Sequence, residues 1–365
     1  YLLVASVPYL NSQREIKRGT LVSKITLAGD RTAPADDHVI FFIGEFPCDV
    51  EGNPIQGIAH SSADQTLDNG LVINHSFSNK PPDRMFYDYH EKITSYVNII
   101  SSHAQAVDPA VTAKTFKVVE SEDPEIVFQY FDTNSSRAEI NMISSKLEGL
   151  KIAIIGLGGT GSYVLDLVAK TSVKEIHLYD KDTFLQHNAF RAPGATPKNK
   201  LDEQPKKVIY LHGIYSNIHK YVIPHEEHLN FSNIDQISDM NFVFICIDTS
   251  EEKKLIMEEL LARNISFIDV GIGVEEIDGA LIGSARITTC TPEKNDHIKT
   301  RVSFSDAGDD LYGQNIQIAE LNALNAALAV IKWKKIYGVY HDQEKEHNSS
   351  YEISINKIIN DESIT

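Results

Sequence analysis

The sequence contains few cysteines and lacks any long hydrophobic run. Its three cysteines, Cys48, Cys246 and Cys290, are far apart and form no CxxC pair, so neither a zinc knuckle nor a disulfide framework is indicated. No window approaches the roughly 18 consecutive apolar residues of a membrane-spanning helix, and the first residues do not have the pattern of a secretory signal peptide. We therefore expect a cytoplasmic protein without a membrane partner.

Positive charge is also scarce. The 365 residues include 34 lysines and arginines against 51 aspartates and glutamates, which gives a formal net charge of −17. This excess of negative charge argues against a nucleic-acid partner, because affinity for nucleic acid comes largely from neutralised phosphates. One segment is the exception, since residues 191–207 carry five basic side chains: Arg191, Lys198, Lys200, Lys206 and Lys207.

Strand-like and helix-like stretches alternate from Lys151 onward, which is typical of βαβ units around a parallel sheet. We predict an α/β fold with a Rossmann-like, doubly wound and mostly parallel sheet in residues 126–365. Residues 1–125 have short strand-like runs interrupted by Gly, Pro, Asn and Asp, and predict a smaller α+β domain. In the second domain we expect strands at 151–155, 175–180, 242–247, 267–270, 280–288 and 351–355, and helices at 137–147, 162–170, 206–218, 251–263 and 314–337.

A glycine-rich turn stands between the first of these strands and the helix that follows. The apolar run Lys151–Ile155 leads directly into Gly156-Leu157-Gly158-Gly159-Thr160-Gly161. Glycines allow the backbone to approach an anion closely, and the free amides of the helix N-terminus point at it. The order strand, glycine turn, helix therefore predicts a site for nucleotide phosphates. Alone, this pattern fits NAD and FAD enzymes as well as enzymes that transfer adenylate.

The residues downstream of the turn favour a triphosphate. Asp180 ends the second strand, about 20 residues past the glycines, where an acidic side chain hydrogen-bonds a ribose hydroxyl. Asn188, Arg191 and the pair Lys206-Lys207 follow, and several phosphate charges need such arginine and lysine side chains. Asp248 ends the third strand and is a candidate ligand of Mg²⁺, which prefers carboxylates together with phosphate oxygens.

These motifs together resemble those of the ThiF/MoeB family, which shares its adenylation domain with ubiquitin-activating enzymes. The resemblance covers about residues 137–330. The motifs that carry it are, in order, Gly156–Gly161, Asp180 with Asp182, Asn188 with Arg191, Lys207 or Lys206, and Asp248. It implies an enzyme that uses ATP and Mg²⁺ to adenylate the C-terminal glycine carboxylate of a ubiquitin-like protein.

The resemblance also implies a role for each matching residue, and a homodimer in which Arg137 reaches the ATP of the neighbouring subunit. Asp248 would hold Mg²⁺. The residues implied in nucleotide binding are Gly156, Gly158, Gly159, Gly161, Asp180, Asp182 and Asn188, and those implied in catalysis are Arg191, Lys207, Asp248 and Arg137.

The chain departs from the family pattern at four points. The interval between Arg191 and the downstream lysine is longer than usual, and no catalytic-cysteine domain is recognisable. Ala192 stands where a glutamine usually follows the arginine, and the paired CxxC zinc sites of many members are absent. Cys290 is the one cysteine near the position where a thioester-forming residue would lie, which makes it the candidate nucleophile.

The first domain carries a second resemblance. Phe41–Cys48 and Lys80-Pro81-Pro82 resemble the sheet and the Pro-Pro segment of ubiquitin-conjugating folds. We expect this domain to bind the modifier or its target, and a ubiquitin-conjugating-like protein to be a further partner. The setting that fits these partners is a prokaryotic conjugation or defence system.

Two other classes of function compete with this interpretation. A nicotinamide-dependent oxidoreductase explains the glycines and Asp180 but gives no role to Asn188, Arg191 and Lys207. A non-catalytic interaction protein would keep the nucleotide fold without the reaction. A comparison of Mg-ATP binding with NAD(P)H binding distinguishes the proposed enzyme from an oxidoreductase. Exchange of pyrophosphate into ATP distinguishes it from a non-catalytic interaction protein.

Overall fold

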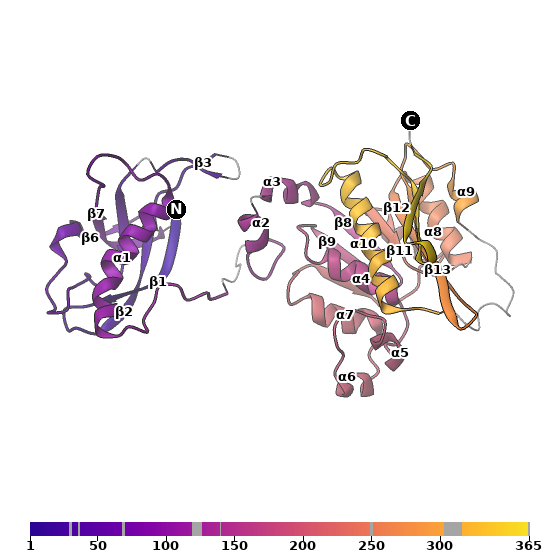
Figure 1. Cartoon of the computed structure of the whole chain (residues 1–365), viewed down its shortest axis with the longest axis horizontal. Helices are drawn as coiled ribbons and strands as arrows, with labels where there is room; N and C mark the ends of the chain where they lie inside the picture. Colours follow the sequence, from indigo (N-terminus) through magenta and orange to yellow (C-terminus); the bar gives the residue numbers. More distant parts are fainter. Residues whose placement is uncertain are drawn as a thin grey trace. The chain divides into compact units, whose positions relative to one another are not determined.

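The computed structural model describes residues 1–28, 31–35, 37–67, 70–118, 126–138, 140–248, 251–302 and 316–363. The chain divides into two compact units, Tyr1–Val118 and Val119–Thr365 (Figure 1). The domain boundary predicted after residue 125 falls at the end of a segment, 119–125, that lies outside the described residues, and it stays a prediction. In the described part of the chain, no helix combines the length and the apolar composition that crossing a membrane requires.

The N-terminal unit is an antiparallel sheet packed against one long helix (Figure 1). The sheet order is β1-β2-β5-β7-β6, and β3 and β4 form a separate two-stranded ribbon. The elements are β1 (Leu2–Leu10), β2 (Ile16–Ser23), β3 (Leu27–Ala28), β4 (Arg31–Thr32), β5 (Val39–Ile43), β6 (Ala59–Thr66), β7 (Val72–Ser78) and α1 (Tyr89–Val107). Alternating residues of the central strands are buried, so one face of the sheet forms a core with α1.

Capping residues fix the start of α1. The Asp88 carboxylate accepts a hydrogen bond from the Glu91 backbone N–H at 2.7 Å, which satisfies one of the free amides of the first turn. The Glu91 carboxylate in turn accepts from the Tyr87 N–H and pairs with Arg84. Together these contacts hold the chain that enters α1.

The second unit contains a larger mixed sheet with helices on both faces (Figure 1). Its strand order is β10-β9-β8-β11-β12-β13-β14-β15. The strands are β8 (Lys151–Ile155), β9 (Glu175–Tyr179), β10 (Val222–His225), β11 (Phe242–Ile245), β12 (Ser266–Ile277), β13 (Ala280–Cys290), β14 (Asn348–Glu352) and β15 (Lys357–Asp361). The helices are α2 (Thr133–Arg137), α3 (Asn141–Ser144), α4 (Gly159–Val168), α5 (Gln186–Ala189), α6 (Lys198–Asp202), α7 (Lys207–Tyr215), α8 (Glu251–Ala262), α9 (Ile298–Arg301) and α10 (Ala319–Ile336).

Two hydrophobic cores lie on opposite faces of this sheet. Apolar side chains of α4, α7 and α10 pack with the strands in one core, which includes the fully buried Trp333. The other core receives Ile256, Met257 and Leu260 of α8 and Ile298 of α9. The five strands from β10 to β12 pair in parallel, as expected for a sheet covered on both faces.

The strand order reverses at the centre of the sheet. β8 has β9 on one side and β11 on the other, so the chain winds outward in both directions from this point. In open α/β sheets such a reversal leaves a crevice beyond the carboxyl ends of the central strands, and ligands bind there. The glycine turn follows β8 and therefore opens into this crevice.

The predicted fold class is confirmed, but several elements differ. The strands β10 and β15 were not predicted, and the strand predicted over 351–355 lies instead at Asn348–Glu352, where β14 ends and a 3-10 turn follows. β12 extends from Ser266 to Ile277 and pairs with β13 in a long antiparallel hairpin, so this edge of the sheet is antiparallel. The helix predicted over 137–147 is wrong, because α2 begins earlier, at Thr133, and the chain makes separate short turns after it. Asp132 accepts from the Asn134 and Ser135 amides and starts that earlier helix.

Candidate functional site

A cavity of about 360 Å³ lies at the carboxyl ends of the central strands. It is bounded by the glycine turn after β8, by the ends of β9 and β11, by the middle of β12 (residues 270–272), and by residues at the start of α10. Eight of the residues proposed from the sequence line it: Gly156, Gly158, Gly159, Asp180, Asp182, Arg191, Lys207 and Asp248. Residues separated by more than 90 positions are thus brought to one place, as the strand reversal requires.

Two glycines are required by packing inside the turn itself. Gly156 has φ +86°, and a Cβ there would lie 2.6 Å from the Cys246 carbonyl oxygen. A Cβ on Gly161 would lie 1.9 Å from the Gly156 carbonyl oxygen. These positions bring the turn close to the end of β11 and start α4 without steric conflict. Gly161 makes its close contact inside the turn and is not among the residues that line the cavity.

The other two glycines have different surroundings. A Cβ on Gly158, the N-cap residue of α4, would meet no atom within 4 Å, so protein packing does not require a glycine there. A Cβ on Gly159 would lie 2.2 Å from the Asn322 side chain of α10. The open space beside Gly158 at the N-terminus of α4 is where the helix amides can receive an anion.

Asp180 is held rigidly at the end of β9. Its side chain is buried, with Oδ2 accepting from the Leu157 N–H at 2.7 Å and Oδ1 accepting from the Asp182 N–H at 2.8 Å. The first of these bonds ties the carboxylate to the glycine turn. Since each carboxylate oxygen has more than one acceptor position, Asp180 can accept further hydrogen bonds from a ligand hydroxyl.

Lys207 pairs with both acids of this strand end. Its ammonium lies 2.8 Å from Asp182 Oδ2 and 3.4 Å from Asp180 Oδ2, and the side chain is nearly buried. The hydrogen bond from Lys207 lowers the pKa of the Asp182 carboxyl below its ordinary value, against a smaller opposing effect of burial. Lys206, the other lysine that the sequence left open, donates to the Lys181 carbonyl at 2.7 Å in an exposed position. The structure therefore places Lys207, and not Lys206, in the cavity.

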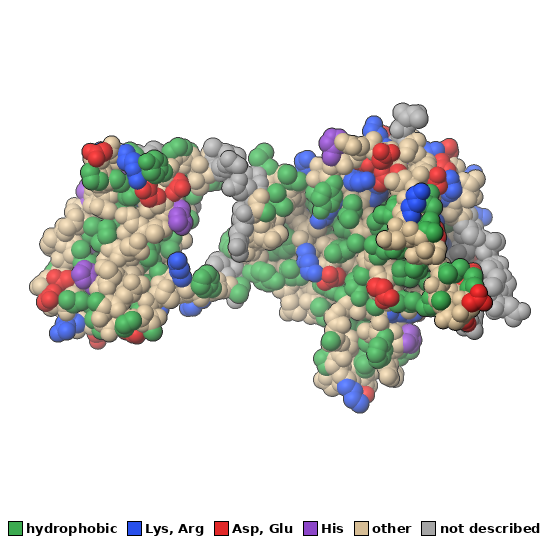
Figure 2. All heavy atoms as spheres, viewed as in Figure 1, with side chains coloured by type: hydrophobic (Ala, Val, Ile, Leu, Met, Phe, Trp, Pro, Cys, Tyr) green, Lys and Arg blue, Asp and Glu red, His purple; other side chains and the backbone are tan. Residues whose placement is uncertain are grey.

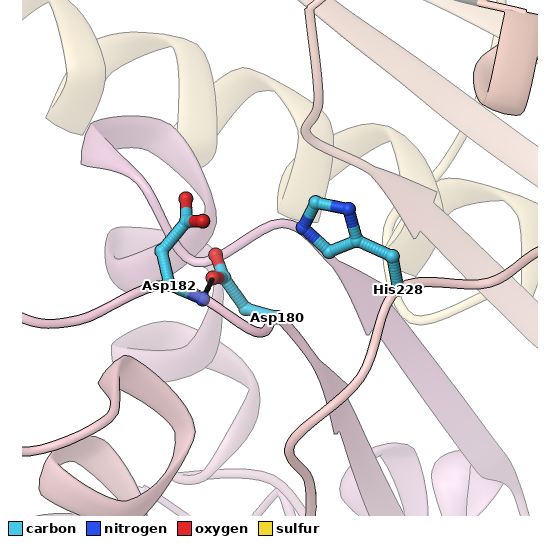
Figure 3. Close-up of side chains that lie close together, drawn as sticks. All are labelled: Asp180, Asp182 and His228. Atoms are coloured by element: carbon cyan, nitrogen blue, oxygen red, sulfur yellow. Dashed lines mark hydrogen bonds between the residues drawn. The ribbon is translucent and has the colours of Figure 1, made fainter.

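Figure 3 shows Asp180 and Asp182 side by side, with the ring of His228 turned toward them. Ligand atoms of these three residues lie within 4.8 Å of one another, a spacing that can hold a metal ion. The Lys207 ammonium already lies against both carboxylates, so a cation is present at this position. The trio therefore gives no reason to place a metal here.

Arg191 lies in the cavity beside Asp248. It follows α5, and the backbone N–H of Arg191 donates to the Asn188 carbonyl at 3.1 Å. Burial lowers the pKa of the guanidinium, and the nearby Asp248 carboxylate partly offsets this shift. Among the described residues, the buried Nε of Arg191 has no hydrogen-bond partner. A buried donor of this kind is able to bind an anion that enters the cavity.

Three other residues predicted from the sequence are not among the described residues that line the cavity. Asn188 is buried but does not line the cavity, because its side chain accepts from the Leu185 N–H at 2.8 Å and holds the turn that leads to Arg191. The Arg137 side chain lies outside the described part of the chain. Cys290 is buried in the core on the α8 face, and desolvation raises the pKa of its thiol to about 12. Since the thiolate is the nucleophile, the structure argues against a thioester at Cys290.

The sequence patterns missed several cavity residues. His228 and Glu252 line the side near Asp182, and Gln317 and Asn322 line the side formed by α10, next to Thr160. The residue types alone gave no signal, because their position depends on how distant segments pack. The one available indication was that Asn322 is polar in a helix whose neighbouring positions are apolar.

The fold and the cavity define a Rossmann-like α/β domain with an anion-compatible site at its strand reversal. Residues 143–294 match the ThiF family, and residues 1–133 match a domain of unknown function (DUF6791). The resemblance to the ThiF family in the second unit is thus confirmed, and it supports a ThiF-type adenylyltransferase. None of the curated proteins is similar enough in sequence to count as a match.

Solved structures share the fold. PaaA is 15% identical, with a TM-score of 0.51, and the similarity covers 84% of this chain and 99% of PaaA. An E. coli MccB structure with MccA-N7isoASN is 13% identical, with a TM-score of 0.52, and the similarity covers 84% of this chain and 96% of MccB. At these levels of identity the likeness shows a common fold.

Proposed function

We propose that this protein is an ATP-dependent adenylyltransferase that activates the C-terminal glycine carboxylate of a ubiquitin-like protein, in a prokaryotic conjugation or defence system. One observation carries the proposal. The glycine turn, Asp180, Arg191 and Lys207 line the same cavity, although they come from four separate segments. A triphosphate carries more negative charge than the pyrophosphate of a dinucleotide, so a half-buried guanidinium and a buried ammonium at this position favour a triphosphate.

In this reaction a carboxylate oxygen of the modifier attacks the α-phosphorus of ATP. A new oxygen–phosphorus bond forms, the bond to the bridging oxygen breaks, and pyrophosphate leaves with the electron pair. The carboxylate is already a nucleophile, so the site needs no general base. Its tasks are to align the reactants and to stabilise the charge that moves toward pyrophosphate.

Different cavity residues would perform these tasks. The α4 amides near Gly158 and the free Nε of Arg191 would bind phosphate oxygens, and Asp180 would accept from the ribose. Lys207 would exchange its contact with Asp182 for the developing charge. Because Asp182 is half exposed, it can be solvated when its partner moves, while the buried Asp180 keeps the two amide bonds that hold it.

The donors around Asp248 fit a magnesium ion. The Asp248 carboxylate is exposed and lines the cavity with Glu252, and oxygen ligands of this kind suit Mg²⁺ when phosphate oxygens complete its coordination. Bound there, Mg²⁺ would neutralise phosphate charge. Asp248 would position it, and its own charge would keep the Arg191 guanidinium oriented toward the same phosphates.

A protein partner is supported by the surface near the cavity. Phe190 and Phe231 are 79% and 87% exposed, and each lies within three residues of a cavity residue, Arg191 and His228 respectively. Aromatic side chains are enriched in surfaces that bind another protein. The similar MccB was solved with MccA-N7isoASN, and we propose a protein terminus as the corresponding partner here.

Three further expectations belong to the same proposal. The chain would act as a homodimer, with Arg137 contributing to the neighbouring site, as the family resemblance implies. The N-terminal unit would recruit the modifier or its target, and a ubiquitin-conjugating-like protein would receive the product. Light scattering of the full chain tests the dimer, and an Arg137→Ala variant that stays dimeric but loses activity would support the shared site.

Exchange of radioactive pyrophosphate into ATP, in the presence of candidate modifiers that end in glycine, tests the proposed reaction. The wild type should catalyse exchange, and Asp248→Ala should abolish it. Glu258→Ala is the matched control, because Glu258 is an exposed acid on α8 outside the cavity lining. Binding of NAD(P)H in place of Mg-ATP would favour an oxidoreductase, and binding of ATP without exchange with any modifier would favour an interaction protein.

A further inference from the structure

Asn322 connects α10 to the glycine turn. It lies in the first turn of α10 and is 1% exposed. Its side-chain amide packs directly on Gly159, because a Cβ at that glycine would lie 2.2 Å from Asn322 Nδ2. Its Oδ1 accepts a hydrogen bond from the Thr160 hydroxyl at 2.9 Å. The amide group is thus fixed against the first two residues of α4.

The other end of this amide has no partner. Asn322 Nδ2 is buried and makes no hydrogen bond within the described residues, while Asn322 itself lines the cavity. Leaving a buried amide donor unpaired costs about 1–3 kcal/mol, so such groups in native proteins call for an explanation. Thr160 accounts for Oδ1, but none of the residues that the structure describes pairs with Nδ2.

We propose that Asn322 Nδ2 donates a hydrogen bond to a phosphate oxygen of the bound nucleotide. This inference rests on the proposed nucleotide site. The position agrees with the chemistry, because an anion at the N-terminus of α4 lies next to Gly159 and Thr160, the residues that Asn322 contacts. A neutral amide adds a donor without adding charge to a cavity that already contains Arg191 and Lys207. α10 would thereby be part of the binding site and not only of the core.

The substitution Asn322→Asp isolates this role. Aspartate has the same shape and keeps an oxygen that accepts from Thr160, but it replaces the donor with an acceptor that repels phosphate. The matched control is Asn325→Asp, which puts the same charge three residues further along α10. Asn325 is equally buried, donates to the Gly271 carbonyl and does not line the cavity.

Calorimetric titrations of the full-length proteins with Mg-ATP, tripolyphosphate and adenosine give the readout, with thermal unfolding as the test of folding. We expect Asn322→Asp to weaken Mg-ATP and tripolyphosphate at least about tenfold, the scale of one hydrogen bond to a charged group, and to leave adenosine nearly unchanged. Asn325→Asp should change the affinities for Mg-ATP and adenosine by the same factor. If Asn322→Asp does not fold, Asn322→Ala should show the same selective loss with a smaller size.

The outcomes separate this inference from the proposed function. If the wild type and Asn322→Asp bind Mg-ATP with equal affinity, the inference is overturned and the adenylation proposal is left intact. An equal loss for adenosine and Mg-ATP would also overturn it, because the residue would then only support the shape of the cavity. A third outcome is that the wild type binds tripolyphosphate but not Mg-ATP, and that Asn322→Asp no longer binds tripolyphosphate. This result would support the inference and contradict the adenylation proposal. Binding of neither probe by the wild type would overturn both.

Discussion

The two units of this protein differ in how many unpaired buried side-chain atoms they contain and in where these atoms lie. The described part of the N-terminal unit has one such atom, Ser101 Oγ of α1. In the N-terminal unit, the buried Tyr96 hydroxyl donates to the His38 carbonyl and accepts from the Asn79 N–H, and the Tyr9 hydroxyl accepts from the Glu45 N–H. In the second unit, Arg191 Nε, Gln317 Oε1 and Asn322 Nδ2 are buried without partners among the described residues, and all three residues line one cavity. Other unpaired buried atoms of this unit, such as Thr289 Oγ1 and Trp333 Nε1, belong to residues that do not line it.

This difference indicates where a ligand belongs. Buried polar groups in native proteins are nearly always paired, and those that are not concentrate at functional sites. Two of these atoms, Arg191 Nε and Asn322 Nδ2, are donors around a single cavity, and a polyanionic ligand would accept a hydrogen bond from each. Gln317 Oε1 is an acceptor and would need a donor, such as a hydroxyl or amino group of the ligand. The N-terminal core needs no such ligand, and its stability should not depend on one.

The sharpest test of this contrast is removal of Lys207. Lys207→Ala takes away the cation that follows the developing charge and leaves the buried Asp180 without its ion pair. We expect pyrophosphate exchange to fall by about 100- to 1000-fold, the size of the effect when a charge-stabilising donor is lost. Lys206→Ala is the matched control, since its ammonium contacts only an exposed backbone carbonyl, and should keep nearly full exchange. Equal losses in the two variants would contradict the assignment of Lys207.

Two neighbouring glycines give the next largest effects. Gly159→Ala puts a methyl group 2.2 Å from the buried Asn322 amide and should lower the free energy of unfolding by about 1–3 kcal/mol, as overpacking does. Gly158→Ala meets no protein atom within 4 Å and replaces only the N-cap residue of α4, so the melting temperature should fall less than in Gly159→Ala while affinity for Mg-ATP falls. Thermal unfolding and calorimetric titration separate the two results. Adding Asn322→Ala to Gly159→Ala should restore much of the lost stability.

A substitution in the N-terminal unit should leave the nucleotide site unaffected. Glu91→Gln removes the Arg84 pair, which lowers the pKa of the Glu91 carboxyl from 4.5 to about 2. Because the folded-state pKa is depressed, the stabilisation is present above pH 4.5 and disappears as the pH falls toward 2. Hydrogen exchange of the α1 amides should therefore be faster in Glu91→Gln at neutral pH, and the difference should vanish near the lower pKa. A change in the Mg-ATP affinity of Glu91→Gln would contradict the expectation that the nucleotide site is independent of the N-terminal unit.

The smallest expected effect is at Cys290. Its thiol is buried and its pKa is raised to about 12, so it is not available as a thiolate nucleophile. Cys290→Ala should keep pyrophosphate exchange close to the wild-type rate and form the same products with the modifier. Loss of a covalent modifier adduct in this variant, with its stability retained, would restore Cys290 as a nucleophile.

The sequence allowed much of the second unit to be predicted because its signals are local. Alternating strands and helices gave the α/β class. The glycine turn, Asp180 and Asp248 were placed at strand ends that the fold brings together, and Arg191 was placed in the basic segment after the second of these strands. Gly161 and Asn188 match the motif but support the turns from behind, because sequence spacing does not show which side of a turn a residue occupies.

The rest depended on tertiary packing. Asn322 reaches the cavity only because α10 packs against α4, some 160 residues earlier in the chain, and no local pattern encodes that contact. β12 was predicted as a four-residue strand over 267–270, because its outer half is mostly exposed and lacks the apolar run of a buried strand, whereas β13 was predicted nearly in full over 280–288. The short turns around α2 and α3 follow from capping by Asp132, which competes with a longer helix.

The central claim is that the cavity at the strand reversal binds a nucleoside triphosphate through Arg191 and Lys207. Titration of Mg-ATP and of NADH into the wild type and into Arg191→Ala tests it most directly. The wild type should bind Mg-ATP and give no response to NADH, and Arg191→Ala should weaken Mg-ATP at least about tenfold. Binding of NADH alone, or an Arg191→Ala variant that binds Mg-ATP as tightly as the wild type, would contradict the claim.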